Sequence, residues 1–319
     1  MKHSIFKLFI SLFIFFSIGV FGDINIGQKT LCTFVNDRPL VMDVWYPTKE
    51  GIPSQREEGV WLFPPIVYDA SIPKDKKLPL ILISHGYGGE RKEQLWLAEK
   101  LAMAGYLVAS VDHFGNTWKD PSPQGMIQMW NRPEDISSAL DYLTGDSPFA
   151  HTIDTKQVGF VGFSVGGMTG LWLAGAEVKS PEVMHLFSEG QKAELVNSID
   201  FTKAMKSYQD DRISQFVLLA PRVSEFSQSS LSKIKKPLLV IYGTEDKVLP
   251  PEEHAKLIEA SNLETLELPH ASHFVFLNQV TEEGKKALSP QLWESSSERA
   301  LFHNQIAETV IIFLKEPIH

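Results

Sequence analysis

The pattern between residues 158 and 174 constrains the fold more than any other feature of the chain. Residues 158–163 form an apolar run typical of a buried strand, and residues 168–174 are small and apolar, as in a closely packed helix. Gly162-Phe163-Ser164-Val165-Gly166-Gly167 joins the two segments. A strand can turn into a helix this abruptly only where glycines flank the turn, because side chains there would strike the neighbouring strand and helix. The pattern predicts a sharp strand–turn–helix with Ser164 at its apex.

The rest of the chain alternates in the same way, which predicts the class of fold. Short apolar runs are separated by stretches with helical spacing; the runs are 80–84, 107–111, 216–220 and 238–242, and the helical stretches include 93–103, 136–143 and 301–315. Continuous apolar strands between helices are typical of a parallel sheet covered on both faces. We therefore predict an α/β fold with a mostly parallel central sheet and helices on both faces. A strand–turn–strand unit at 31–35 and 40–46 precedes it, and 47–78 is expected to be a surface loop.

Two stretches do not follow the strand–helix alternation. Residues 114–132 contain two tryptophans and two methionines among prolines and glycines, and residues 176–213 carry a mixed apolar and charged helical pattern. Insertions of this size in a compact fold often form lids over a site. An extra helical layer packed on the surface is the alternative, and the sequence leaves both interpretations open, with 176–213 as the candidate helical lid.

The first 22 residues differ in composition from the rest. Basic residues near the start are followed by an apolar run over 8–21, and Val20 and Gly22 stand at positions −3 and −1 of a cut before Asp23. This is the pattern of a secretory signal peptide, and the run is short for the roughly 20 residues of a membrane anchor, the alternative interpretation. We expect a cleaved signal peptide at 1–22, a single domain over 23–319, and a secreted or periplasmic protein without stable membrane insertion.

Charge and motif content narrow the possible partners. Without residues 1–22 the chain has 28 basic and 39 acidic residues, which argues against nucleic acid or an anionic membrane surface as a partner, because both attract positive charge. Cys32 is the single cysteine, so neither an internal disulfide nor a thiolate metal cluster is expected. The chain has no HExxH motif, P-loop or carboxylate cluster, and we expect neither a metal nor another cofactor.

The turn at Ser164 predicts a nucleophile. A serine raised above the sheet on a strand-to-helix turn, with a helix start behind it, is the arrangement of α/β-hydrolases. Its hydroxyl needs a general base and an acid that orients the base, which follow in the order serine, acid, histidine. Asp246 lies just after the run 238–242, with Glu245 as the rival, and is the predicted acid.

His273 is the predicted base. It comes 27 residues after Asp246, in the loop beyond a predicted strand at 263–268, and His270 is the main competitor. His254 and His303 fall on predicted helices, where a lone histidine is more often a surface or satisfied core residue. The base would take the Ser164 proton during attack and return it to the leaving group, while the acid fixes the tautomer of the base.

The glycines of Ser84-His85-Gly86-Tyr87-Gly88-Gly89 follow the run 80–84 and let the backbone turn its N–H groups toward a developing anion. With the N–H of Val165, they would form an oxyanion hole. His85 is expected to brace its own loop. Asp112 and His113 could mimic a second acid–base pair, but they precede the serine, which favours loop bracing for them as well.

These motifs resemble a known group. Residues 84–89, 111–117 and 132–136, the run 158–167, Ser272-His273-Phe274 and the segment 38–47 are similar to predicted dienelactone-hydrolase-like proteins and bacterial relatives of platelet-activating-factor acetylhydrolase. The resemblance spans roughly residues 30–315. It implies an α/β-hydrolase fold, the catalytic residues Ser164, Asp246 and His273, and an oxyanion hole made by the N–H groups of Tyr87 and Val165.

The sequence departs from this family at two points. Phe163 stands where the family commonly has histidine, and the nucleophile is serine, whereas dienelactone chemistry characteristically uses cysteine. The leading hypothesis is a secreted hydrolase of carboxylic esters, with a short-acyl ester or a phospholipid-type lipid as substrate. A serine peptidase or amidase on the same fold is the alternative, and a non-catalytic binding protein is a third possibility.

Overall fold

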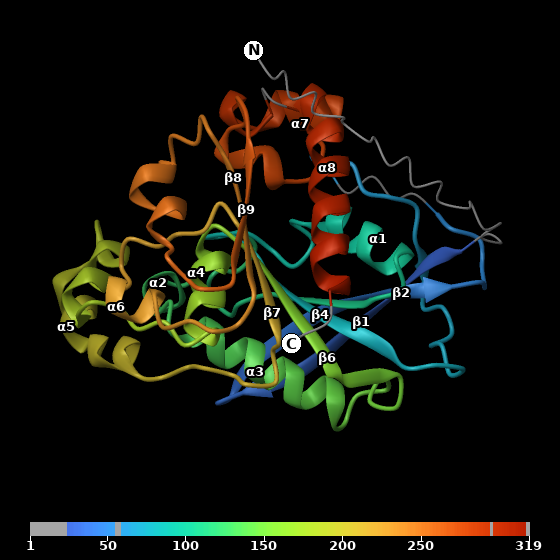
Figure 1. Ribbon diagram of the computed structural model, residues 1–319, viewed down its shortest axis with the longest axis horizontal. Coiled ribbons are helices and arrows are strands. Elements are labelled where there is room, and N and C mark those ends of the chain that lie inside the picture. The colour runs from blue at the N-terminus through green and yellow to red at the C-terminus, as the bar shows by residue number, and fades with distance from the viewer. Residues whose placement is uncertain (1–23, 55–58, 294–295, 317–319) are drawn as a thin grey trace, which may run out of the picture.

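The computed structural model describes residues 24–54, 59–293 and 296–316 (Figure 1). The predicted signal peptide at 1–22 lies outside the described residues. All nine strands of the described residues belong to one sheet, in the order β3-β1-β2-β5-β4-β6-β7-β8-β9. Their bounds are β1 Asn25–Val35, β2 Arg38–Thr48, β3 Val67–Tyr68, β4 Leu78–Ser84, β5 Leu107–Val111, β6 Ile153–Phe163, β7 Gln215–Leu219, β8 Leu238–Gly243 and β9 Leu263–Leu268.

The sheet is parallel from β5 to β9 and antiparallel where β1, β2 and β5 meet. Asn36 and Asp37 form the two-residue turn between β1 and β2, both with positive φ (48° and 63°). Two residues of this kind with φ above zero match the right-handed twist of a hairpin, and Asn and Asp tolerate that conformation. The predicted strand–turn–strand unit is therefore confirmed, and its strands extend further than the sequence pattern indicated.

The helices also occupy the predicted places. The α-helices are α1 Leu95–Met103, α2 Pro123–Ile127, α3 Asn131–Thr144, α4 Val165–Leu173, α5 Ala193–Ser198, α6 Gln228–Leu231, α7 Glu282–Ala287 and α8 Ser296–Lys315. Short 3-10 helices are η1 Pro181–Ser188, η2 Phe201–Met205, η3 Pro251–Glu253, η4 Ala255–Leu257, η5 His273–Phe276 and η6 Pro290–Leu292. No helix within the described ranges is long and apolar enough to cross a bilayer.

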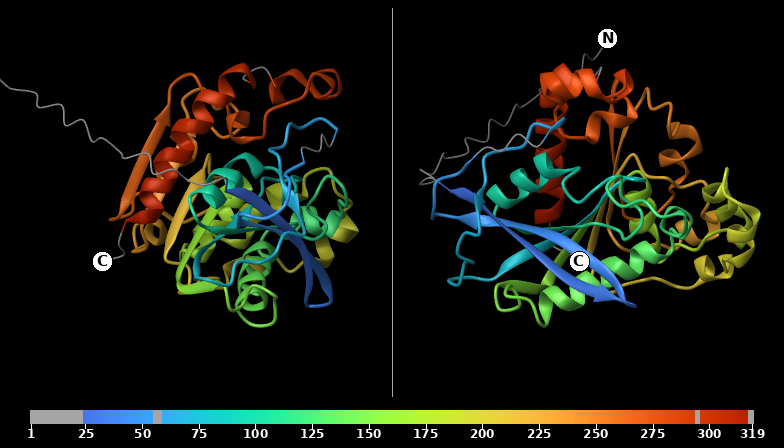
Figure 2. Two further views of the ribbon diagram at one scale, coloured as in Figure 1. Left: turned by 90° about the vertical axis from the view of Figure 1, so that its right-hand side faces the viewer. Right: turned by 180° about the vertical axis from the view of Figure 1, so that it is seen from behind.

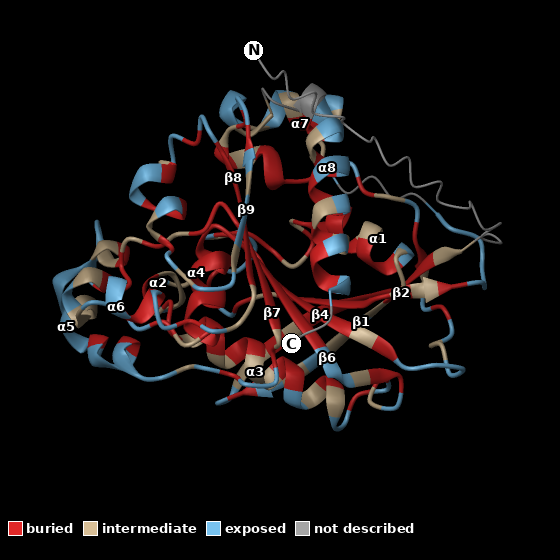
Figure 3. Ribbon diagram, viewed as in Figure 1, coloured by how far each residue is buried: buried red, intermediate tan, exposed pale blue. Residues whose placement is uncertain are grey.

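Helices cover both faces of the sheet, as the views in Figure 2 show. Side chains of α1 and α8 form one apolar core with Ile81, Val108 and Val161, whereas α3 and α4 form the other with Leu80 and Phe160. Neighbouring strand residues point to opposite faces, so the continuous apolar runs supply both cores. The buried central strands are plain in Figure 3.

The strand order fixes where a site can form. After β4 the chain crosses through α1 to β5 on one side of the β4–β6 pair, whereas after β6 it crosses through α4 toward β7 on the other side. The two crossovers diverge at the carboxyl ends of β4 and β6, and ligands of open α/β sheets bind at such a switch point. The loops after β4, β5, β6, β7 and β8 all reach this edge.

The segment 176–213 is less helical than its sequence pattern indicated. It consists of η1, the six-residue α5 and η2, joined by extended backbone. Pro181 and Gly190, the latter at φ 75°, interrupt any longer helix. The segment does lie beside the site edge, because η1 packs against α2 of the other insertion.

Candidate active site

Ser164 occupies a strained turn between β6 and α4. Its φ of 56° and ψ of −113° are rare for a residue with a side chain, and such strain persists only where the surroundings enforce it. A Cβ on Gly162 would lie 2.2 Å from the Gly166 oxygen, and one on Gly166 would lie 2.0 Å from the oxygen of Ser84. The two glycines therefore let β6, α4 and the end of β4 approach backbone to backbone.

A line of hydrogen bonds joins the three predicted site residues. His273 Nε2 lies 3.1 Å from Ser164 Oγ, and His273 Nδ1 lies 2.7 Å from Asp246 Oδ2. The other carboxylate oxygen, Asp246 Oδ1, accepts the N–H groups of Val248 and Leu249 at 2.9 and 2.8 Å. All three side chains are buried, with Ser164 the most accessible at 8%. The structure thus brings Ser164 together with Asp246, which lies 82 positions later in the sequence, and with His273, which lies 109 positions later.

The competing acid and base form a separate pair on the surface. His270 Nδ1 lies 2.8 Å from Glu245 Oε1, and both side chains are mostly exposed. His270 has a positive φ of 61°, and its N–H donates to Thr244 Oγ1. Neither side chain contacts Ser164, so the geometry favours His273 and Asp246 over these rivals.

Of the N–H groups of residues 86–89, three have protein acceptors among the described residues. Gly86 N–H donates to Glu93 Oε2 at 2.8 Å, Gly88 N–H to Asn116 Oδ1 at 3.3 Å, and Gly89 N–H to the Gly86 oxygen at 3.2 Å. Within the part of the chain that the structure describes, the N–H of Tyr87 has no such partner. The N–H of Val165 opens α4, where the first turn has no intrahelical acceptors.

Aromatic side chains pack around this group. The Phe163 ring lies 5.0 Å from the His273 imidazole, centroid to centroid, and is buried behind it. The residue that departs from the family pattern therefore packs against the predicted base. On the open side, the Tyr87 ring lies 5.9 Å from Phe187 of η1, and its hydroxyl donates to the Met126 oxygen of α2. Both insertions thus contact the side chain of Tyr87.

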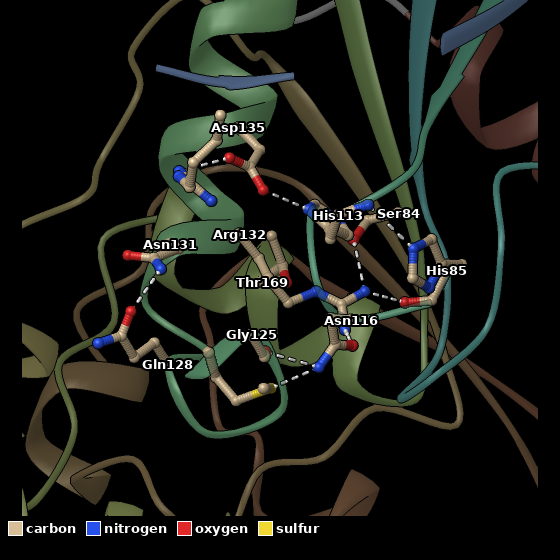
Figure 4. Close-up of polar contacts among 12 residues, drawn as sticks. Ser84, His85, His113, Asn116, Gly125, Gln128, Asn131, Arg132, Asp135 and Thr169 are labelled. Atoms are coloured by element: carbon tan, nitrogen blue, oxygen red, sulfur yellow. Dashed lines mark hydrogen bonds and ion pairs between the residues drawn. The ribbon is translucent and has the colours of Figure 1, made fainter. Parts of the chain in front are cut away.

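A second Ser–His–Asp set lies behind the loop (Figure 4). Ser84 Oγ is 2.9 Å from His113 Nε2, and His113 Nδ1 is 2.9 Å from Asp135 Oδ2. All three are at most 2% exposed, and Asp135 also pairs with Arg38 at 2.8 Å. Burial, together with the nearby arginines, holds the pKa of His113 well below its usual range, so its imidazole is neutral.

The remaining candidates brace their surroundings. Asp112 pairs with Arg91 and not with His113. His85 Nδ1 donates to the Gly86 oxygen at 2.7 Å, in agreement with the loop-bracing role favoured for it. His254 lies between η3 and η4, not on a longer helix, and accepts the N–H groups of Val223 and Ser224. His303, on α8, stacks on Trp96 at 3.7 Å and bonds the Val275 oxygen.

Comparison with known proteins finds that the chain is similar to several hydrolases. A family model described as X-Pro dipeptidyl-peptidase (S15 family) matches residues 65–196. The Bacillus subtilis protein YtaP, named as a hydrolase, is 23% identical over 199 residues, covering 54% of this chain and 62% of that protein. Bis(hydroxyethyl) terephthalate hydrolase of Streptomyces coelicolor is 31% identical over 101 residues, covering 32% of this chain and 30% of that protein. Cutinase 2 of Thermobifida cellulosilytica is 33% identical over 96 residues, covering 30% and 33%.

A solved structure extends the likeness to nearly the whole fold. The ferulic acid esterase from Streptomyces cinnamoneus aligns with a TM-score of 0.59 and 19% identity, covering 92% of this chain and 89% of that one. The chain therefore has the α/β-hydrolase fold, as predicted. It spans less than two thirds of the length of the curated relatives above. The narrower resemblance to dienelactone-hydrolase-like proteins and platelet-activating-factor acetylhydrolase stays a prediction.

Proposed function

We propose that this chain is a serine hydrolase that cleaves carboxylic esters through an acyl-enzyme on Ser164. The observation that carries the proposal is the hydrogen-bonded line from a buried carboxylate through an imidazole to a serine on a strained turn. This geometry matches that of the Ser–His–Asp catalytic triads that recur on unrelated folds, which supports the proposal. The matching proteins named as an esterase, a cutinase and a terephthalate hydrolase support the same class of reaction.

Each residue would have a defined task in two half-reactions. His273 Nε2 takes the proton as Ser164 Oγ attacks the ester carbon, and Asp246 stabilises the imidazolium that forms. The oxyanion accepts the N–H groups of Tyr87 and Val165. The bond to the leaving oxygen then breaks, and Nε2 returns the proton to the departing alcohol. Water, deprotonated by the same nitrogen, attacks the acyl-enzyme and releases the carboxylic acid.

The same proposal includes a substrate class and a location. We infer a short-acyl ester or a phospholipid-type lipid, as the sequence resemblance implies. Tyr87, Phe114 and Trp118 expose apolar surface on the loops after β4 and β5, where such a substrate would approach. The pattern of residues 1–22 supports action outside the cytoplasm.

A peptidase or amidase is the second candidate, because the family model that matches residues 65–196 is named for an X-Pro dipeptidyl-peptidase. An acyl-enzyme on Ser164 would serve either reaction, since both proceed through an oxyanion. Paired substrates separate them: a p-nitrophenyl ester series of increasing acyl length against aminoacyl p-nitroanilides. Preference for an anilide over every ester would favour the peptidase.

Covalent labelling tests the nucleophile directly. A fluorophosphonate probe should label the wild-type chain, and Ser164→Ala should abolish labelling. Ser84→Ala is the matched control, because Ser84 also has a histidine and an aspartate in line but is completely buried; its labelling should persist. An unlabelled wild type, or equal labelling of Ser164→Ala, would contradict the catalytic proposal and favour a binding protein.

A further inference from the structure

We propose that Arg132, at the start of α3, is a positioning residue of the oxyanion hole. From behind, its guanidinium holds the loop after β4 in the one arrangement that leaves the Tyr87 N–H free for a ligand. Arg132 lies 45 positions from Tyr87 in the sequence, in the segment 132–136 that carries the family resemblance, and the sequence predicted no role in the site for it. The inference rests on the proposed esterase function and is tested separately from it below.

The His85–Gly86 peptide is held at both ends. Its carbonyl accepts a hydrogen bond from Arg132 Nη2 (Figure 4), and its N–H donates to Glu93 Oε2 at 2.8 Å. Arg132 is buried and Glu93 is half-buried, and the two side chains contact opposite ends of one peptide plane. A trans peptide points its carbonyl and its N–H in opposite directions, so these two contacts fix the rotation of the plane.

The next peptide is the one that carries the Tyr87 N–H. Its carbonyl, on Gly86, accepts from His85 Nδ1 at 2.7 Å and from Arg132 Nη1 at 3.5 Å. The structure contains no cis peptide among its described residues, so the Tyr87 N–H points away from Arg132. A cation at the carbonyl end also polarises the peptide, which strengthens a hydrogen bond donated by its N–H.

Asn116 completes the support on the far side of Tyr87. Arg132 Nη1 donates to Asn116 Oδ1 at 3.2 Å, and the same oxygen accepts the Gly88 N–H at 3.3 Å. The peptides before and after Tyr87 are thus held through one guanidinium. This explains why the N–H groups of Gly86 and Gly88 have internal acceptors while that of Tyr87 does not.

Arg132 carries its guanidinium into the interior of the protein, behind the loop after β4. Arg132 is 1% exposed, makes no ion pair with a carboxylate of the described residues, and leaves its Nε without an acceptor. Burial lowers its pKa to about 9. Its hydrogen bonds go to the His85 and Gly86 oxygens and to the Ser84 and Asn116 side chains, so the contacts of its guanidinium are concentrated on the loop and its support.

The test is Arg132→Lys, with Arg299→Lys as a matched control. Arg299 is also buried and also donates to two backbone oxygens, those of Asn278 and Leu292, but on α8. A lysine keeps the charge but lacks the planar fork that reaches several acceptors. We expect Arg132→Lys to lower kcat for p-nitrophenyl acetate by about 100-fold, the effect of losing one oxyanion donor, with KM within about threefold.

A transition-state readout separates positioning from general loss of structure. The affinity for a boronic acid, which forms a tetrahedral adduct with the serine, should fall in Arg132→Lys by the same factor as kcat/KM. Inhibition by the carboxylic acid product should be unchanged. Arg299→Lys should retain both properties within about threefold while losing comparable thermal stability. Equal losses in the two variants, or a kcat of Arg132→Lys within threefold of wild type, would overturn the inference.

Glu93→Met tests the support at the other end of the His85–Gly86 peptide. It removes the acceptor for the Gly86 N–H at similar volume, so kcat and boronic acid affinity should again fall together. Retention of both properties would refute the positioning role. Failure of both Arg132→Lys and Glu93→Met to fold would also refute it, because it would assign these side chains to folding. The proposed function is judged by wild-type labelling alone: if the wild type labels and these variants behave normally, only the positioning role is wrong.

Discussion

Asp246→Asn should inactivate the enzyme by trapping His273 in the wrong tautomer. Asp246 Oδ1 accepts two N–H groups, from Val248 and Leu249, so the asparagine oxygen must take that place. Its NH₂ group then faces His273 Nδ1, which has to accept a hydrogen bond and cannot carry a proton. The proton moves to Nε2, 3.1 Å from Ser164 Oγ, and this nitrogen can no longer act as a base.

The size of the effect follows from two terms. A carboxylate beside an imidazolium contributes about 4 kcal/mol at 4 Å in an effective dielectric of about 20, or close to three orders of magnitude in rate. Turning the amide around to restore the tautomer would leave buried N–H groups unpaired, at about 1–3 kcal/mol each. Together these terms predict a loss in kcat of about 10⁴-fold with little change in KM.

The assay is steady-state hydrolysis of p-nitrophenyl acetate at pH 8, with Glu245→Gln as control. Glu245 is adjacent in sequence but pairs with the exposed His270, so its variant should keep kcat within about twofold. Circular dichroism should show both variants folded. An Asp246→Asn enzyme within tenfold of wild type, or a larger loss in Glu245→Gln, would refute the reasoning.

Three further predictions concern side chains around the site. His273→Ala should lower kcat by about 10⁴-fold or more, whereas His270→Ala should keep kcat within about threefold of wild type. The opposite result in the same ester assay would make His270 the base. Phe187→Ala should raise KM for longer acyl chains by about tenfold with kcat nearly constant, because the ring contacts Tyr87 at the open side; an acyl-length series showing no change would remove η1 from the substrate site. Burial raises the pKa of Glu93 from 4.5 to about 7, so the stability from its neutral form is complete below pH 4.5 and lost as pH rises through 7. Glu93→Gln should therefore gain up to about 3 kcal/mol in unfolding free energy relative to wild type between pH 5 and 8, and a pH-independent difference in urea titrations would contradict this.

Local periodicity predicted most of the fold because the sheet is buried on both faces. The runs around Leu80, Val108 and Val161 are apolar without alternation, as strands covered by helices on both sides must be. The segment 176–213 was predicted less well. Its apolar residues belong largely to short 3-10 helices, in which apolar residues do not recur with the regular spacing of an α-helix or a strand.

In the candidate site, too, one part could be predicted from the sequence and another could not. Ser164, Asp246 and His273 each follow a strand that ends at one sheet edge, so topology alone brought the three near one another. The contacts of Arg132 with the loop after β4 could not be predicted from the topology in this way. Arg132 belongs to a helix that crosses behind the loop, and its acceptors are backbone carbonyls, which any sequence would supply.

The two Ser–His–Asp sets show why residue types and distances are insufficient to assign chemistry. Ser84 and Ser164 both lie about 3 Å from an imidazole whose other nitrogen faces a carboxylate. Ser84 ends a regular strand, is completely buried, and also lies 3.4 Å from Arg132 Nη2. Ser164 instead stands at positive φ at a helix start, partly accessible and facing free N–H groups. A nucleophile needs access and a place for the charge that it creates, and among the described residues only the turn at Ser164 combines both with a base.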